Sequence, residues 1–159
     1  MRSKTFFASI VCGLVAIAVQ PKSAAAATPT LAGSWQFTLT PTSPPTPPVI
    51  QIPGLVTFTT DGSAIETDGS ELINHRSPGH GIWQAGPTPG SLYVEYISLV
   101  LTAEGSLSAR DVTTMLLSQS STGNQFAGSY TTVQEAGGVT ITLSSGTVSG
   151  QLIPHVPLP

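Results

Sequence analysis

Large apolar and small polar residues alternate along much of the chain after residue 30, the pattern of strands that bury one face. Between residues 33 and 40, Trp35, Phe37 and Leu39 fall on one side of an extended strand and Ser, Gln and Thr residues on the other. Similar segments recur about nine times, separated by short Gly-containing turns at intervals of roughly 8 to 14 residues. No later segment shows helical periodicity, so we predict an all-β protein.

The turns connect neighbouring strands directly. Asp61-Gly62 after the apolar run 55–60 predicts a tight hairpin, and Gly86 and Gly90 with two prolines mark another turn before the long strand 92–102. Sequential hairpins favour an up-and-down meander, and closing it removes exposed edges. We therefore predict an up-and-down antiparallel β-barrel of about eight or nine strands, in preference to an open sandwich. Gly128 and Gly150, inside strand patterns, would suit bends or bulges.

Six prolines lie between residues 41 and 53. Because proline has no backbone N–H to donate to a central ladder, this stretch is interpreted as an extended, proline-rich arm. An arm of this kind could alternatively dock a partner protein, in which case the chain would be a structural or surface-interaction protein.

The first 27 residues have the features of a secretory signal peptide. Arg2 and Lys4 precede the apolar run Phe6–Val19, which is followed by the small residues 25–27. The run is 14 residues long, short of the roughly 20 that a membrane-spanning helix needs. We predict a secreted or periplasmic protein with no membrane span in the mature chain, a single domain over residues 28–153, and a flexible tail over 154–159.

The charged, cysteine and lysine residues of the chain exclude several partners and reaction types for the mature protein. After residue 27 only Arg76 and Arg110 stand against eight carboxylates, a net charge of 2 − 8 = −6, so we expect no nucleic-acid partner. The one cysteine, Cys12, lies in the signal segment, and no lysine follows residue 22. Disulfides, thiol nucleophiles and Schiff-base chemistry are thereby excluded for the mature chain.

Four short motifs carry a family resemblance: Gly33-Ser-Trp35, the hairpin 58–62, the segment Ser77-Pro-Gly-His-Gly-Ile-Trp83, and Phe126-Ala-Gly128. Together they resemble small exported bacterial proteins of the lipocalin-like, or calycin, type, over residues 31–153. The resemblance implies a barrel with one internal cavity for a small apolar ligand. A second resemblance, to barrel cyclases of the allene oxide cyclase kind, implies a cavity whose chemistry depends on shape and a few polar groups.

Aromatic residues are the side chains from which such a cavity would be built. The ligand-binding candidates are Trp35, Phe37, Phe58, Trp83, Tyr96, Phe126 and Tyr130.

Glu95, flanked by Tyr93 and Tyr96, is the carboxylate of most interest. If it points inward, burial would raise its pKa and make it a general acid or base; otherwise it is an outer-wall residue. Glu95 and Tyr93 are the catalytic candidates. Arg110 and Asp111 are adjacent in a strand and point to opposite faces; an inward Arg110 could pair with Glu95 or hold a ligand carboxylate.

His75 and His80, near three acidic residues, suggest a metal site only by proximity. The sequence favours a turn-stabilising hydrogen bond for His80 and a solvated His75 over metal binding. We assign no metal and no cofactor. No Gly-x-Ser-x-Gly elbow points to a hydrolase.

The sequence therefore favours an exported lipocalin-like barrel that binds a small apolar molecule without transforming it, as a monomer or weak dimer. The alternative is a cofactor-free cyclase or isomerase that uses acid–base groups in the cavity.

Overall fold

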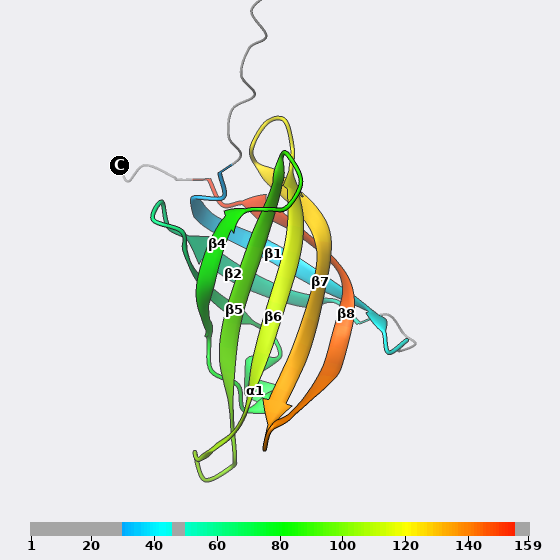
Figure 1. Cartoon of the computed structure of the whole chain (residues 1–159). Helices are drawn as coiled ribbons and strands as arrows, with labels where there is room; N and C mark the ends of the chain where they lie inside the picture. Colours follow the sequence, from blue (N-terminus) through cyan, green and yellow to red (C-terminus); the bar gives the residue numbers. More distant parts are fainter. Residues whose placement is uncertain (1–29, 46–49, 155–159) are drawn as a thin grey trace, which may run out of the picture.

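The computed structural model describes residues 30–45 and 50–154. In this part of the chain eight antiparallel strands form one closed barrel, and each strand pairs with its neighbours in the sequence (Figure 1). The predicted all-β, up-and-down barrel is therefore confirmed. The predicted signal peptide, residues 1–27, and nearly all of the predicted tail lie outside the described residues.

The strands are 6 to 14 residues long, and one short helix, α1, lies between β3 and β4. The elements are β1 (Gly33–Ser43), β2 (Ile52–Phe58), β3 (Ser63–Asp68), α1 (Glu71–Asn74), β4 (Gly79–Ala85), β5 (Ser91–Leu101), β6 (Leu107–Gln119), β7 (Gln125–Ala136) and β8 (Val139–Leu152). None of the described helices has the length and hydrophobicity needed to cross a membrane.

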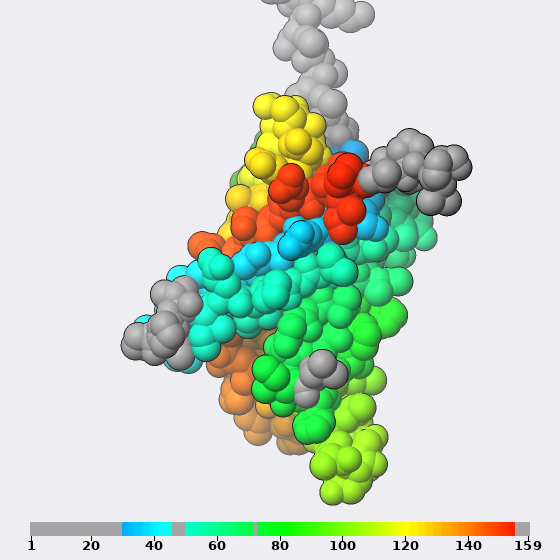
Figure 2. Space-filling view, turned by 180° about the vertical axis from the view of Figure 1, so that it is seen from behind, coloured from blue at the N-terminus to red at the C-terminus, as the bar shows by residue number. Residues whose placement is uncertain are grey.

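The barrel is closed by pairing of the first strand with the last. The register runs from Trp35 opposite Leu152 to Thr40 opposite Thr147, and β1 lies between β8 and β2 (Figure 2). The up-and-down order gives the barrel two distinct ends. The terminal end holds the start of β1 and the end of β8, and the α1 end holds α1 and the loop from residue 102 to 106 (Figure 1).

The barrel interior contains the apolar residues that alternate along the strands. Trp35 and Phe126 pack with their ring centroids 5.2 Å apart near the terminal end. The indole Nε1 of Trp35 donates a 2.7 Å hydrogen bond to the carbonyl of Leu31, which is itself fully buried. The residues that precede β1 therefore close the terminal end of the barrel.

Gly128 and Gly150 do not form the bulges that the sequence suggested. Instead, their lack of a side chain lets neighbouring atoms lie close to the backbone. A Cβ on Gly128 would lie 2.0 Å from the carbonyl oxygen of Leu116, and one on Gly150 would lie 2.3 Å from the ring of Phe126. The register shifts occur elsewhere, where Thr42 of β1, Ser108 of β6 and Leu143 of β8 are extra residues opposite their partner strands.

The connection between β1 and β2 is shorter than the proline-rich stretch 41–53, because both strands extend into that stretch. Pro41 lies within β1 opposite Gly146, and Pro53 lies within β2 opposite Thr38. The segment between the two strands is residues 44–51, of which 46–49 lie outside the described residues.

Candidate functional site

A cluster of polar side chains fills the α1 end of the barrel interior. β3 places Glu66 and Asp68 inward after Ala64, and β5 and β6 place Ser98 and Asp111 inward. All four polar residues are buried, with Glu66 only 1% exposed and Ser98 fully inaccessible. Such burial is costly unless each polar group finds a partner. We call these four residues and Arg76 the polar cluster.

Arg76 is the cation of this cluster and comes from the segment after α1. The helix ends at Asn74, and the left-handed backbone of its C-cap, His75 (φ 50°), turns the chain back toward the barrel. Arg76 then forms an isolated bridge with Val100 of β5. This reversal delivers the guanidinium to the barrel end, where only 9% of the side chain is exposed.

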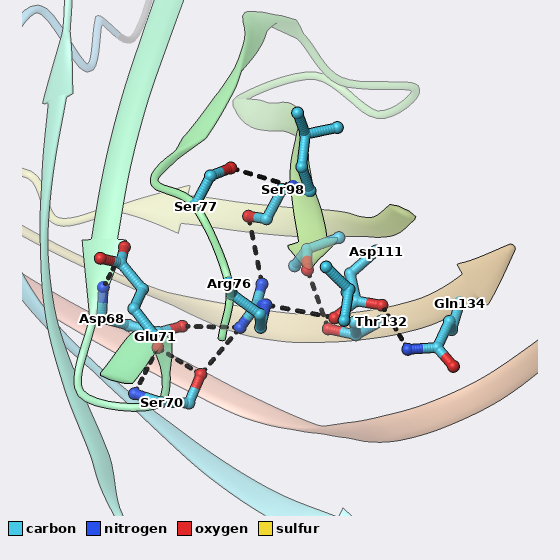
Figure 3. Close-up of polar contacts among 12 residues, drawn as sticks. Asp68, Ser70, Glu71, Arg76, Ser77, Ser98, Asp111, Thr132 and Gln134 are labelled. Atoms are coloured by element: carbon cyan, nitrogen blue, oxygen red, sulfur yellow. Dashed lines mark hydrogen bonds and ion pairs between the residues drawn. The ribbon is translucent and has the colours of Figure 1, made fainter. Parts of the chain in front are cut away.

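The guanidinium lies between two carboxylates (Figure 3). Its Nη1 is 3.4 Å from Asp68 Oδ2, and its Nε is 3.1 Å from Asp111 Oδ2. Nη1 also donates to the hydroxyl of Ser70 at 2.8 Å, and Nη2 donates to the hydroxyl of Ser98 at 3.2 Å. A buried pair of this kind fixes geometry more than it adds stability.

The two aspartates have further donors. Asp68 accepts hydrogen bonds from the backbone N–H and the hydroxyl of Ser70. Asp111 accepts one from the side-chain amide of Gln134, which points inward from β7 (Figure 3). Asp68 is thus held by Ser70 and Arg76 on either side of α1, and Asp111 by Arg76 and by Gln134 of β7.

Glu66 differs from the aspartates. Burial raises its pKa to about 9, and the negative charge of Asp68 and a hydrogen bond to that residue add to the shift, while Arg76 opposes it. Glu66 therefore holds its proton at neutral pH. A Cβ on Gly79 would lie 2.8 Å from Glu66 Oε2, so the absence of a side chain at Gly79 makes room for this carboxyl.

Two buried side-chain atoms among the described residues lack a hydrogen-bond partner, and both belong to the polar cluster. One is Glu66 Oε1, and the other is Arg76 Nε. Arg76 Nε is close enough to Asp111 for an ion pair, but its N–H is not directed at that oxygen. Buried polar groups in native proteins are nearly always paired, so each exception needs an explanation.

Tyr96 connects the polar cluster to the apolar interior. Its side chain is 1% exposed, and burial raises the pKa of the phenol well above its usual range, with the nearby Glu66 carboxyl adding to the shift. The phenol therefore remains neutral and can serve only as a hydrogen-bonding group.

All seven predicted ligand-binding aromatics lie on the inner side of the barrel. Six are at most 3% exposed, and Trp83 packs partly buried against the same core, with its indole N–H bonded to the carbonyl of Thr59. A ligand-sized void would leave such side chains accessible to a water-sized sphere. In this structure the aromatic interior is therefore filled by its own side chains.

Glu95 and Tyr93, the catalytic candidates, lie on the outer face of β5. The inner face of this strand carries Leu92, Val94 and Tyr96, and the opposite parity turns Glu95 outward. The hydroxyl of Tyr93 donates to Glu95 at 2.5 Å, and this bond raises the pKa of the tyrosine. The inward orientation that acid–base chemistry at Glu95 required is not present.

Of the adjacent pair in β6, Asp111 points inward and Arg110 outward. Arg110 pairs with Glu135 of β7 on the outer surface, and neither Glu95 nor the barrel interior is its partner. The inward cation is Arg76 instead.

Both histidines considered for a metal site, His75 and His80, are exposed. His75 forms the C-cap of α1, and His80 lies in β4 between Ile65 and Ile97 of the neighbouring strands. Across the described residues no group of three His, Cys, Asp or Glu side chains is placed to hold a metal ion.

Grooves on the outside of the barrel are open to solvent. One of about 650 Å³ crosses β1, β6, β7 and β8 and is lined mainly by Gln, Ser and Thr side chains. Among the described residues that line it none is charged, and the one aromatic, Phe126, has its ring in the core. This groove offers only amide and hydroxyl groups to a ligand.

Sequence reasoning missed the polar cluster as a unit. The signal was present in β3, where Ala64, Glu66 and Asp68 share a parity, but the apolar Ile65 between them suggested the opposite inner face. Ile65 is 49% exposed. The role of Arg76 depends on the reversal at His75, which no local pattern indicates.

Comparisons with protein-family models, with curated protein sequences and with solved structures return no match for this chain. The closed eight-stranded antiparallel barrel is consistent with a lipocalin-like fold.

Proposed function

We propose that this protein is an exported, lipocalin-like barrel that binds a small, largely apolar molecule where the aromatic interior meets the polar cluster. The observation that carries the proposal is the pair of buried atoms without a hydrogen-bond partner in the polar cluster, Glu66 Oε1 and Arg76 Nε. Tyr96 and the other inward aromatics border this position, and because they fill the interior of the free protein, binding requires them to repack around the ligand. The basic and apolar character of residues 1–27 supports secretion or a periplasmic location.

The unpartnered oxygen favours binding over a purely structural role. Leaving a buried polar atom without a partner costs about 1 to 3 kcal/mol, and a hydrophobic residue of similar volume would avoid that cost. A ligand that supplies the missing hydrogen bond recovers this free energy on binding. The cost in the free protein thus becomes affinity in the complex.

Entry at the α1 end is the route that disturbs the least structure. Residues 69–78 cover this end and are held by Arg76, by two backbone bonds to β5 (Leu101 N to His75 O and Ser77 N to Leu99 O), by a bond from Leu99 N to the hydroxyl of Ser77, and by one from Gly69 N to the carbonyl of Pro53 in β2. α1 has one turn and no side-chain cap bond, and its Ile73 is 79% exposed. Opening such a segment breaks fewer contacts than separating two strands.

Ligand screening tests the proposal. Purified protein is titrated with a library of small apolar compounds, and the emission of Trp35 and Trp83 and the thermal midpoint are followed. A binder is expected to raise Tm and to change the emission at micromolar concentrations. If no compound in a broad library changes either signal, the binding proposal is wrong.

A reversible cross-link tests the entry route. Because the chain after residue 27 has no cysteine, a Cys pair at His75 and Leu101 can be introduced without competing thiols. Oxidation is expected to slow ligand uptake at least tenfold and reduction to restore it, with the reduced protein as the matched control. Equal uptake in both states would place entry elsewhere.

A second function is favoured by one observation. Glu66 is a buried acid that keeps its proton beside the neutral phenol of Tyr96, which is the equipment of a cyclase or isomerase that works by proton transfer. Here Glu66 would take the acid–base role proposed for Glu95 from the sequence, and Tyr96 would hold the substrate by a hydrogen bond. Recovery of a bound compound as an isomer, or with deuterium from heavy water, would establish this activity; unchanged compound supports binding alone.

A further inference from the structure

The outer groove that crosses β1, β6, β7 and β8 has a row of amide side chains on its surface. Gln36 of β1 and Gln125 of β7 both pair with Gln151 of β8 in the register of the barrel. All three residues are exposed and line the groove, and β1 and β8 lie side by side on the face seen in Figure 2. The Cβ atoms of directly opposite residues on neighbouring strands are about 4.5 to 5.5 Å apart. The three amides therefore form one row across three strands.

A second row, two residues from the first on β1, β7 and β8, carries mainly hydroxyl groups. Thr38 pairs with Ser149, and Ala127 pairs with both Ser149 and Ser118. Side chains two residues apart on a strand point to the same face, and all four residues line the same groove. Amides and hydroxyls thus form an array of two rows on one surface.

The polar groups of this array are available to a ligand. Among the described residues, the amide and hydroxyl side chains of the two rows make no hydrogen bond to another protein group. At the edge of the groove, by contrast, the amide of Gln119 donates to the carbonyls of Thr30 and Gly123. The hydroxyl of Ser120 accepts a hydrogen bond from the backbone N–H of Gln125. Each free amide offers a carbonyl oxygen as an acceptor and an NH₂ group with two donors.

The size and the chemistry of the groove define the class of ligand. A volume of about 650 Å³ is typical of sites for drug-sized molecules, and four strands spaced about 4.8 Å apart give a width of about 14 Å. Because none of the described lining residues is charged, an ionic ligand would lose hydration without gaining an ion pair. An apolar ligand would gain little, because the ring of Phe126 is in the core. The groove therefore fits a neutral molecule that carries many hydroxyl groups.

A peptide is another neutral, polar molecule of this size, and the sheet disfavours it. Peptides that bind to sheets add a strand to an exposed edge, and pockets for their side chains give specificity. Each of the four strands has a neighbour on both sides in the closed barrel, so the described part of these strands offers no edge. A sugar, whose hydroxyl groups surround the ring, needs no edge.

We propose that this groove binds a neutral oligosaccharide. The amide row donates hydrogen bonds to the hydroxyl groups of the sugar and accepts hydrogen bonds from them, and the Thr and Ser hydroxyls of the second row bind the neighbouring part of the ligand. Among the described lining residues no aromatic ring is exposed for stacking. Binding therefore depends on hydrogen bonds, and a Kd of about 0.1 to 10 mM is expected. The site lies outside the barrel and is independent of the interior binding function proposed above.

Titration of the ¹⁵N-labelled protein with tetrasaccharides tests this inference. The neutral probes are the β-1,4-linked tetramers of glucose, xylose and N-acetylglucosamine and the α-1,4-linked tetramer of glucose, each added to about 10 mM. At least one is expected to bind and to shift the side-chain amide signals of Gln36, Gln125 and Gln151. The tetramer of galacturonate, which is charged, and a tetrapeptide of Ala and Ser should bind at least tenfold more weakly.

Three results would overturn the inference. They are no binding of any neutral tetramer, binding that leaves the three amide signals unchanged, and equal or tighter binding of the galacturonate tetramer or the peptide.

Substitution of the central amide assigns the binding to this groove. Gln151 lies between the other two amides, so Gln151→Ala is expected to raise the Kd of the bound tetramer at least tenfold. Gln84→Ala is the matched control, because Gln84 is an exposed amide of β4 outside the groove, and it should leave the Kd unchanged. An unchanged Kd in a folded Gln151→Ala protein would contradict the proposal, and the amide shifts in the unmodified protein decide it if that variant does not fold.

Discussion

Glu66 and Glu95 are the same residue type on neighbouring parts of one barrel, yet their environments differ completely. Glu66 points inward and has a pKa raised to about 9, whereas Glu95 points outward and accepts a hydrogen bond from Tyr93. The apolar neighbours of Glu95 in the sequence made it the natural candidate. Whether each carboxyl points inward or outward depends on its place in the alternation of side chains along its strand. A shift of one residue exchanges the inner and outer faces.

Removing the carboxyl of Glu66 is expected to change how stability depends on pH. The pKa is about 9 in the folded protein and has an ordinary value of 4.5, so between these values the folded state holds a proton that the unfolded chain has released. The free energy of unfolding therefore falls as pH rises, by about 1.4 kcal/mol per pH unit. Relative to the unmodified protein, Glu66→Gln should gain on the order of 4 kcal/mol between pH 5 and pH 8.

Urea unfolding at several pH values between 5 and 8 measures this difference. Glu95→Gln serves as the control and should follow the unmodified protein across the whole range. Parallel pH profiles for Glu66→Gln and the unmodified protein would show that Glu66 does not bind a proton on folding.

Arg76 and Arg110 offer a second comparison at the residue scale. Arg76→Met leaves Asp68 and Asp111 buried without their cation and should cost about 3 to 5 kcal/mol. Arg110→Met breaks an outer pair with Glu135 and should cost about 1 kcal/mol or less. Equal losses for the two variants, measured by urea unfolding at pH 7, would contradict the burial of Arg76.

At the scale of elements, the hairpins were predictable and the polar end was not. Alternation placed the aromatics of β1 on the inner face, and Asp61-Gly62 marked the turn between β2 and β3, because both signals are local. The polar cluster draws on β3, β5, β6 and the segment after α1. Ser98 and Asp111 face each other across the adjacent strands β5 and β6, but Glu66 and Asp68 lie two strands away on β3 and meet them only through closure of the barrel and the segment after α1. Sequence patterns do not encode that placement directly.

Close packing between β6 and β7 gives an element-scale prediction. A Cβ at Gly128 would lie 2.0 Å from a backbone oxygen of β6, which no side-chain rotation can relieve. Gly128→Ala should therefore destabilise the barrel by about 3 kcal/mol. Ser129→Ala, next to it on the outer face, should change stability by about 0.5 kcal/mol or less. Thermal unfolding of both variants checks the prediction, and a neutral Gly128→Ala would mean that the strands can separate locally.

At the scale of the whole molecule, the two ends of the described chain lie side by side. The backbone N–H of Ile153 donates to the carbonyl of Ser34, and the side chain of Gln119 bonds to the carbonyl of Thr30. The barrel therefore depends on the order of its strands around the circle more than on where the chain begins.

A circular permutant tests that statement. Residues 30 and 154 are joined by a short Gly/Ser linker, and new termini are opened between Glu104 and Gly105 in an exposed turn. The permutant should keep the β-sheet circular dichroism spectrum and a Tm within about 10 °C of the parent. Opening the chain between Thr113 and Thr114 inside β6 is the control and should prevent folding. Loss of structure in the first permutant would show that the original order of the strands along the chain is needed.

Pairing of β1 with β8 also sets a minimum time between the synthesis of the first strand and closure of the barrel. The last residue of β1 is 43 and the last of β8 is 152, so 152 − 43 = 109 residues must be made before the barrel can close. At roughly 5 to 20 residues per second, one edge of the first strand waits about 5 to 20 s for its partner. Pro41 lies on that edge, opposite Gly146, and proline hinders pairing with a foreign strand. Pro41 pairs with β8 in the finished barrel. Before β8 is made, it thus also hinders pairing of the open β1 edge with a strand of another chain.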